Sequence, residues 1–319
     1  MELAVIIFLF LVGILFIVKG GDYFVDAASW IAEVSGIPKL IIGATIVSLA
    51  TTLPEMLVSV MAAAKGSVDM AIGNAVGSVT ANIGLIMGIS LVCIPAVIRR
   101  KDYLMKSVLM LTAAVLIVVS GFLGQMGTVI SIALMAVFAL FLWENVSSAR
   151  RSMKGDGEQE GRKKTSGRKE VVTNLVKFAV GAVGIVWGAD LLVDNGSALA
   201  AMVGIPERVI GVTIIAVGTS LPELITTITA IAKKQSSLSV GNILGANIID
   251  LTLILPLSAF VSGKALPIAE TSARLDLPAC LIVGCIAVIP AMIWEKFQRW
   301  QGILLLAAYG GYLFLTLRA

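Results

Sequence analysis

Apolar segments long enough to cross a lipid bilayer recur along nearly the whole chain, with short polar stretches between them. A transmembrane helix needs about 17–25 predominantly apolar residues. Ten segments meet that length, at residues 3–19, 37–63, 70–95, 103–121, 127–144, 171–193, 205–232, 238–262, 276–293 and 300–317. Because the bilayer core offers no water to bond the backbone, each segment is expected to be helical. The pattern predicts an all-α membrane protein with ten transmembrane helices.

The composition agrees with this pattern. Of the 319 residues, 58% are hydrophobic and 14% are charged, whereas soluble domains carry about 25% charged residues. This difference excludes a soluble globular protein. The first apolar segment has the length of a signal peptide, but it carries Glu2 in place of a basic region and lacks a small-residue cleavage site. We expect this segment to be retained as a helix.

The chain contains three cysteines, Cys93, Cys280 and Cys285, and no histidine. An odd number of cysteines near membrane depth argues against a disulfide framework and favours core packing. The absence of histidine removes Ser–His and Cys–His nucleophile pairs and histidine-ligated zinc or haem. We therefore expect no enzyme activity and no cofactor.

Basic residues gather in two of the polar stretches. Residues 149–170 hold eight basic and four acidic residues, and a second cluster comprises Arg99, Arg100, Lys101 and Lys106. If ten spans alternate, both stretches lie on one side of the membrane, which the positive-inside tendency identifies as cytoplasmic. We expect a multi-pass plasma-membrane protein with both termini extracellular, the lipid bilayer as its surroundings, and neither a nucleic-acid nor a protein partner. The long stretch has the composition of a solvated linker, with lipid-headgroup or nucleic-acid binding as the alternative.

The sequence repeats itself at an offset of 168 residues. Residues 36–65 and 204–233 are identical at 14 of 30 positions without a gap. The chain therefore divides into a first five-helix repeat (1–146), a basic cytoplasmic linker (147–170) and a second five-helix repeat (171–319). Because five is odd, the second repeat enters the membrane upside down. Such inverted repeats are typical of secondary transporters, whose binding site lies between the repeats.

Three carboxylates lie deep within the predicted spans: Glu55, Glu223 and Asp250. Asn82 occupies the position of the first repeat that matches Asp250. An acidic residue at a helix centre costs about 2.5–3.5 kcal/mol on translocon scales, and no lysine or arginine is predicted at similar depth. The remaining ways to compensate these charges are bound cations or protonation.

Each buried glutamate follows a proline, Pro54 or Pro222, which removes a helical hydrogen bond and frees a carbonyl. Hydroxyl groups surround the two positions, and glycine-rich segments follow them at residues 73–78 and 241–246. These oxygens are hard ligands of the kind that Ca²⁺ and Na⁺ accept. Several residues also have structural readings: Ser and Thr can bond their own helix, Asn74 and Asn242 can bond between helices, and Asp22, Asp26, Asp190 and Asp194 can be solvated or capping groups.

The two copies of T-[ST]-L-P-E followed by G-N-x-x-G resemble the sodium/calcium exchanger family of the Ca²⁺:cation antiporter superfamily, of the prokaryotic potassium-independent type. The family's alpha repeats match residues 43–90 and 211–258. The resemblance implies exchange of about three Na⁺ for one Ca²⁺ by sliding of the first and sixth helices over a fixed core. It implies metal ligands at Glu55, Glu223, Thr51, Thr52, Ser78, Thr219 and Ser220, at the carbonyls of Ser48 and Ala216, and an inner polar pair at Asn82 and Asp250.

The chain departs from the family pattern at two positions. Thr52 stands where serine is common, which keeps the hydroxyl group. Ala246 stands where many members have serine, which removes a hydroxyl from an outer Na⁺ site and puts the sodium stoichiometry in question. Potassium-dependent relatives carry aspartate where this chain has Glu223.

The expected function is therefore a secondary active Na⁺/Ca²⁺ antiporter that exports Ca²⁺ against Na⁺ influx by alternating access and is electrogenic. A Ca²⁺/H⁺ antiporter on the same fold is the first alternative, with H⁺ competing for the carboxylates. A passive cation channel is an alternative from a different class. An intramembrane enzyme is a more distant one, because no nucleophile–base pair is visible.

Overall fold

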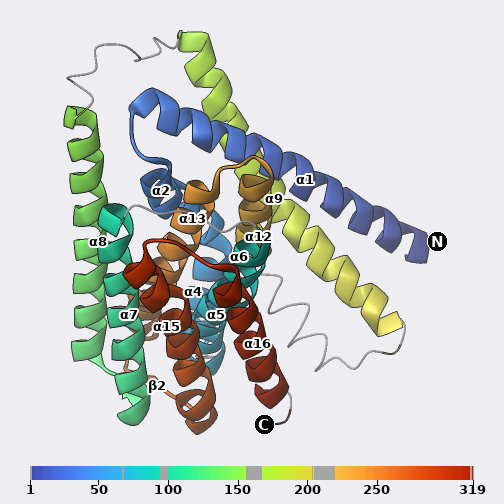
Figure 1. Ribbon diagram of the computed structural model, residues 1–319. Helices are drawn as coiled ribbons and strands as arrows, with labels where there is room; N and C mark the ends of the chain where they lie inside the picture. The colour runs from blue at the N-terminus through green and yellow to red at the C-terminus, as the bar shows by residue number, and fades with distance from the viewer. Residues whose placement is uncertain are drawn as a thin grey trace.

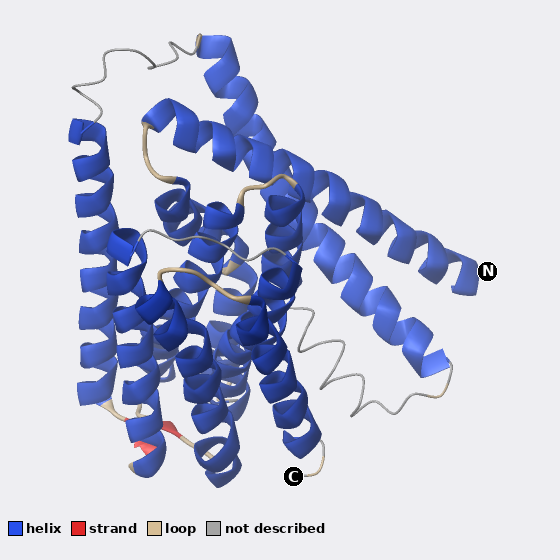
Figure 2. Ribbon diagram, in the orientation of Figure 1, coloured by secondary structure: helices blue, strands red, loops and turns tan. Residues whose placement is uncertain are grey.

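A computed structural model shows a bundle of helices with two very short strands (Figures 1 and 2). It describes residues 2–66, 68–93, 100–155, 167–202, 204, 220–316 and 318. Within these residues, β1 (Gln125–Met126) pairs antiparallel with β2 (Leu266–Pro267). Figure 2 shows this pair at one end of the bundle, where it joins the two halves of the chain.

The helices follow the chain in two similar series, with η marking π-helical segments. The first series is α1 (Glu2–Ser35), α2 (Lys39–Ile42), η1 (Gly43–Val47), α3 (Ser48–Thr51), α4 (Leu53–Ala64), α5 (Val68–Ala81), η2 (Asn82–Met87), α6 (Gly88–Cys93), α7 (Arg100–Phe122) and α8 (Thr128–Gly155). The second is α9 (Arg168–Met202), α12 (Leu221–Ala232), α13 (Ser236–Ile249), η5 (Asp250–Ile254), α14 (Leu255–Ser262), η6 (Ser272–Asp276), α15 (Leu277–Trp294) and α16 (Arg299–Thr316).

The sequence repeat is matched by helix bounds in the described residues. Helices α4 and α12 each have 12 residues, α5 and α13 each have 14, and the paired helices begin 168 residues apart. The π-helical segments η2 and η5 begin at the matched residues Asn82 and Asp250. In α4 and α12 the proline lies in the first turn. Backbone N–H groups of a first turn have no partner within the helix, so the proline costs the helix no hydrogen bond.

Seven helical segments of the described residues are long and apolar enough to cross a membrane. The second predicted span is a pair of helical segments bent by 48° at Thr52, and counting that pair as one span raises the total to eight. Helix α12 is the described part of the seventh predicted span, because residues 205–219 lie outside the described residues. Helix α16 occupies the tenth. The helical membrane protein is confirmed, and the count of ten spans stays a prediction.

Helices α1 and α9 form a pair that extends away from the bundle (Figure 1). They pack mainly on each other. At their crossing Gly20 meets the backbone of Gly181 and Ile185, and a Cβ at Gly181 would collide with the backbone of Phe24. The two backbones touch directly because glycine has no side chain to separate them.

Helix α13 lies at the centre of the bundle, and every residue from Leu238 to Ile249 is buried. It packs on the α2–η1–α3 segment with almost no side chains between the backbones. A Cβ at Gly241 would collide with the carbonyl of Leu40, and one at Gly245 would lie 2.6 Å from the carbonyl oxygen of Ala44. This close contact fixes the segment that leads to Thr51 and Glu55 against the second half of the chain.

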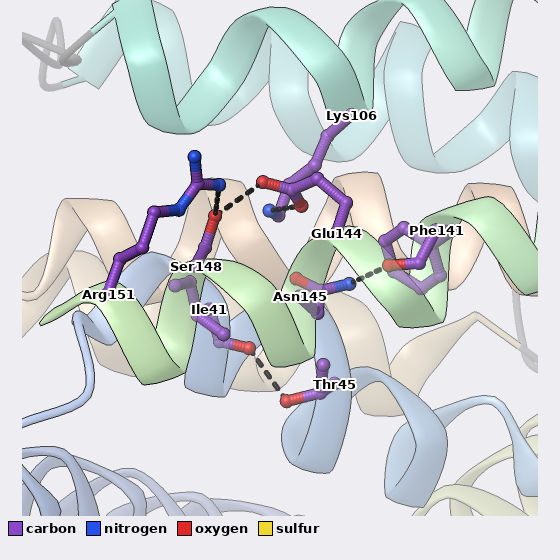
Figure 3. Close-up of polar contacts among 8 residues, drawn as sticks. All are labelled: Ile41, Thr45, Lys106, Phe141, Glu144, Asn145, Ser148 and Arg151. Atoms are coloured by element: carbon purple, nitrogen blue, oxygen red, sulfur yellow. Dashed lines mark hydrogen bonds and ion pairs between the residues drawn. The ribbon is translucent and has the colours of Figure 1, made fainter. Parts of the chain in front are cut away.

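A buried ion pair joins α7 to α8 (Figure 3). Lys106 is fully buried, and its Nζ lies 2.5 Å from Oε2 of Glu144. Ser148 donates a hydrogen bond to Oε1 of Glu144 at 2.7 Å, and Arg151 donates to Ser148. From the sequence, Lys106 was grouped with a polar basic cluster. The structure corrects this placement, because the helical register of α7 turns Lys106 towards α8.

We expect Lys106→Met to lower the free energy of unfolding by about 3 kcal/mol, because the Glu144 carboxylate then stays buried without its cation. The double variant Lys106→Met/Glu144→Met should recover most of this loss, since it removes both charges. Thermal unfolding in detergent measures both. Equal melting temperatures for the single and double variants would contradict the importance of the pair.

Gly241→Ala should lower the melting temperature, because the added methyl group meets the Leu40 carbonyl. Alanine at a helical glycine otherwise stabilises a helix by about 0.5–1 kcal/mol. Gly310→Ala in α16 is the matched control, since a Cβ there has no neighbour within 4 Å. A Gly241→Ala protein as stable as Gly310→Ala would refute the close contact.

Candidate cation-binding site

The three carboxylates predicted at membrane depth are all buried. Glu55, Glu223 and Asp250 each have an exposed fraction of 1%. Glu55 lies in the first turn of α4 and Glu223 in the first turn of α12. A helix N-terminus carries a partial positive charge. The N-terminal ends of α4 and α12 therefore aim two favourable dipoles at the two glutamates.

Most oxygens of these carboxylates lack a partner in the described part of the chain. Within the described residues, neither oxygen of Glu55 or Asp250 accepts a hydrogen bond, and neither does Oε2 of Glu223. Among the described residues, no lysine or arginine forms an ion pair with any of the three. A buried carboxylate without a partner is costly. The site therefore needs cations or protons to be stable.

Hydrogen bonds connect the two halves of the chain at this place. Thr52 donates to Oε1 of Glu223 at 3.3 Å. The Thr51 hydroxyl lies 3.3 Å from both the Ser48 carbonyl and Oδ1 of Asn242, so one proton is shared between two acceptors. The last residue of α3 thus contacts α13, Thr52 at the bend contacts α12, and the two glutamates face a common region.

Two asparagines hold the glutamate helices in place. Asn74 of α5 donates to the carbonyl of Glu55 at 3.2 Å and to Ser59 at 2.9 Å. Asn242 of α13 donates to Thr226 at 2.9 Å while it accepts from Thr51. From the sequence, both were expected either to supply amide oxygens or to bond between helices, and the structure shows bonds between helices. Their repeated position in the G-N-x-x-G motif was the available signal for a role in orienting the ligand-bearing segments.

The remaining predicted ligands are also buried where the structure describes them. The Ser78 and Ser220 hydroxyls and Oδ1 of Asn82 have no hydrogen-bond partner among the described residues. Asn82 donates to Oδ1 of Asn247 at 3.2 Å, and no sequence motif had indicated Asn247 as part of the site. Ser48 donates to Thr45 and leaves its own carbonyl close to Thr51. Ala216 and Thr219 lie outside the described residues.

The donor set is made of oxygens. Among the described residues, no three carboxylate or thiol side chains come together in one metal-binding group. A cation at Glu55 and Glu223 would therefore also need hydroxyl and carbonyl oxygens, of which the described residues hold those of Ser48, Thr51, Thr52 and Ser220. Ca²⁺ accepts six to eight such oxygens, and transition metals prefer nitrogen or sulfur. The residues present fit hard cations.

Comparison with known proteins agrees with this chemistry. The family described as sodium/calcium exchanger protein matches residues 5–146 and 173–318. The sodium/calcium exchanger MaX1 of Methanosarcina acetivorans is 30% identical over 346 residues, covering 95% of this chain and 96% of its own length. The inner membrane protein YrbG of Escherichia coli is 33% identical over 320 residues, covering 94% and 93%.

Solved structures of the sodium-calcium exchanger NCX_Mj have the same fold. One, from a crystal soaked with Na⁺ and Sr²⁺, superimposes with a TM-score of 0.79 at 28% sequence identity and covers 96% of this chain and 97% of NCX_Mj. The family match, these relatives and the shared fold together show that the chain belongs to the sodium/calcium exchanger protein family, whose members are membrane antiporters and not enzymes.

Proposed function

We propose that this protein is a Na⁺/Ca²⁺ antiporter that exports Ca²⁺ against Na⁺ influx. The observation that carries the proposal is the pair Glu55 and Glu223, one from each repeat, both buried and neither paired with a cationic side chain in the described residues. One divalent ion or several monovalent ions neutralise such a pair. The function of the relative MaX1, a sodium/calcium exchanger by name, supports the same ions.

The proposed ion ligands lie near the starts of α4, α12, η2 and η5. Glu55 and Glu223 would hold Ca²⁺, with Asn82 and Asp250 as an inner polar pair. The other proposed ligands are the side chains of Thr51, Thr52, Ser78, Thr219 and Ser220 and the carbonyls of Ser48 and Ala216. Burial of all the described members, and the unpaired oxygens among them, support this assignment.

We also propose ten transmembrane helices in two inverted repeats, in a plasma membrane, with both termini extracellular. The matched bounds of α4 with α12 and of α5 with α13 support the repeat. The basic residues of the linker support the orientation. Inverted repeats let one site open to either side as the repeats exchange conformations.

Exchange, as opposed to leak, follows from the charge of the empty site. If no cation is bound, the buried carboxylates are left uncompensated, and this penalises any closed state between the two open ones. A bound Ca²⁺ or bound Na⁺ removes the penalty. The transporter therefore returns only when it carries an ion.

Protons could take the place of Na⁺ in the proposed exchange. Ala246 is fully buried in α13 and offers no side-chain oxygen, so one Na⁺ ligand expected from the family pattern is absent. Protons can neutralise the same carboxylates. A Ca²⁺/H⁺ antiporter is therefore the second candidate, and a passive cation channel is the third.

Ion flux in proteoliposomes distinguishes the three. Vesicles loaded with Na⁺ and diluted into Na⁺-free medium containing ⁴⁵Ca²⁺ should accumulate Ca²⁺, because outward Na⁺ movement drives the exchange. Uptake driven only by a pH gradient would establish Ca²⁺/H⁺ exchange, and equilibration without either gradient would establish a channel. Glu55→Gln and Glu223→Gln should each abolish the uptake while keeping the melting temperature. Glu270→Gln, at a glutamate whose side chain is 76% exposed, is the control and should transport normally.

The membrane potential tests the stoichiometry. If three Na⁺ exchange for one Ca²⁺, one net charge crosses per cycle, and this is worth about 2.3 kcal/mol per 100 mV. Under Na⁺-loaded conditions, a potential that is positive inside, set with K⁺ and valinomycin, should speed Ca²⁺ uptake because net positive charge leaves the vesicle. A rate independent of potential would require two Na⁺ per Ca²⁺.

A further inference from the structure

One lysine ties the α1–α9 pair to the rest of the bundle. Lys233, at the end of α12, lies 3.2 Å from Oδ1 of Asp22 and 2.9 Å from Oδ1 of Asp26, both in α1. Its Nζ also donates to the Asp22 carbonyl at 3.0 Å. The two aspartates were expected to be solvated or capping residues. The structure shows that they share one cation from another helix.

The repeat places an equivalent set of charges in the other half. At an offset of 168 residues, Lys65 matches Lys233, and Asp190 and Asp194 match Asp22 and Asp26. Asp190 and Asp194 lie close enough for their charges to repel each other. Yet Lys65 is exposed, and no ion pair joins it to either aspartate in the described part of the chain. The same three residues are therefore engaged in one half and separated in the other.

Helix packing has the same asymmetry. Helix α1 packs along α12, where Gly21 meets Ile225 and Thr229 so closely that a Cβ would lie 2.8 Å from the Thr229 hydroxyl. The equivalent contact would join α9 to α4. Within the described residues, α9 does not pack along α4 in this way. The α1–α9 pair is thus docked on the end of the bundle that carries Lys233 and undocked from the end that carries Lys65.

We propose that the two charge sets are alternating latches: Lys233 with Asp22 and Asp26 holds the conformation described here, and Lys65 with Asp190 and Asp194 holds the opposite one. This rests on the proposed alternating access of inverted repeats, in which each repeat adopts the conformation of the other. In the proposed orientation, the first latch lies at the cytoplasmic ends of its helices and the second at the extracellular ends. As α1 leaves α12, α9 approaches α4, and one latch opens while the other closes.

The latches bias the equilibrium without locking it. Lys233 is 26% exposed and its partners are 44% and 58% exposed, and ion pairs this exposed contribute little each. Loss of one latch should therefore change the ratio of the two conformations by about threefold. Ca²⁺ added on one side of the membrane binds only to the conformation that is open to that side. The apparent Ca²⁺ affinity measured from that side therefore changes by the same factor.

Substitution of the lysines gives the first test. Lys233→Ala and Lys65→Ala should shift the Ca²⁺ half-saturation measured from a given side by about threefold in opposite directions, and the double variant should return towards wild type. Lys234→Ala is the matched control, because it removes a lysine charge at the residue next to Lys233. The Lys234 side chain is exposed and forms no ion pair in the described residues. Shifts in the same direction, or none, would overturn the proposal.

Cross-linking gives the second test, in the full chain with Cys93, Cys280 and Cys285 replaced by serine. A short bis-methanethiosulfonate reagent should bridge Asp26→Cys to Lys233→Cys, and in other molecules Asp194→Cys to Lys65→Cys. Each bridge should stop Na⁺-driven Ca²⁺ uptake until dithiothreitol cleaves it. In a variant with all four cysteines, the first bridge should prevent the second.

The outcomes separate this proposal from the proposed function. If the protein without native cysteines exchanges Na⁺ for Ca²⁺ but residues 65 and 194 never cross-link under any Na⁺ or Ca²⁺ condition, the latches are refuted and the antiporter stands. If the wild-type protein shows no coupled exchange, the proposed function fails first. Residues 26 and 65 belong to the two different latches, which lie at opposite ends of the helices, so cysteines at these positions should not cross-link in either conformation.

Discussion

The structure depends on the burial of two carboxylates, Glu55 and Glu223, where the two halves of the chain meet. No cationic side chain of the described residues pairs with either of them. Charge in a low-dielectric interior must be neutralised or it raises the free energy of the fold by several kcal/mol. A soluble protein could hydrate such groups. Here the surrounding helices bury Glu55 and Glu223. Under the proposed function, a bound ion would neutralise their charge, and each transport cycle would exchange one bound ion for another.

The glycine contacts between α13 and the α2–η1 segment support this arrangement. They bring the backbones of the two halves so close that the threonines before α4 reach partners in α12 and α13. The contrast with the Lys106–Glu144 pair is informative. That pair is buried too, but each charge has its counter-charge 2.5 Å away, so it joins two helices and needs no ion.

The sequence was sufficient for the helical membrane fold, because apolar length and the 168-residue repeat are properties of the chain itself. It also predicted that Glu55 and Glu223 are buried, which the structure confirms, while their role as cation ligands stays a prediction. It did not reveal that Asn242 bridges Thr51 and Thr226, or that Lys106 is buried. Both depend on which way a helix faces its neighbour, and no local pattern records that. It also could not show which of two equivalent aspartate pairs is engaged, because a repeated sequence is the same in both conformations.

The difference between Asn82 and Asp250 breaks the symmetry of the repeats by one charge. Both residues are buried at the starts of matched π-helical segments, so the site is more negative towards the second half than towards the first. A perfectly symmetric carrier would work equally fast in either direction at equal gradients. Under the proposed function, the additional carboxyl group of Asp250 would make the rates of transport in the two directions unequal, because the cation would meet a carboxyl group in one half and an amide in the other.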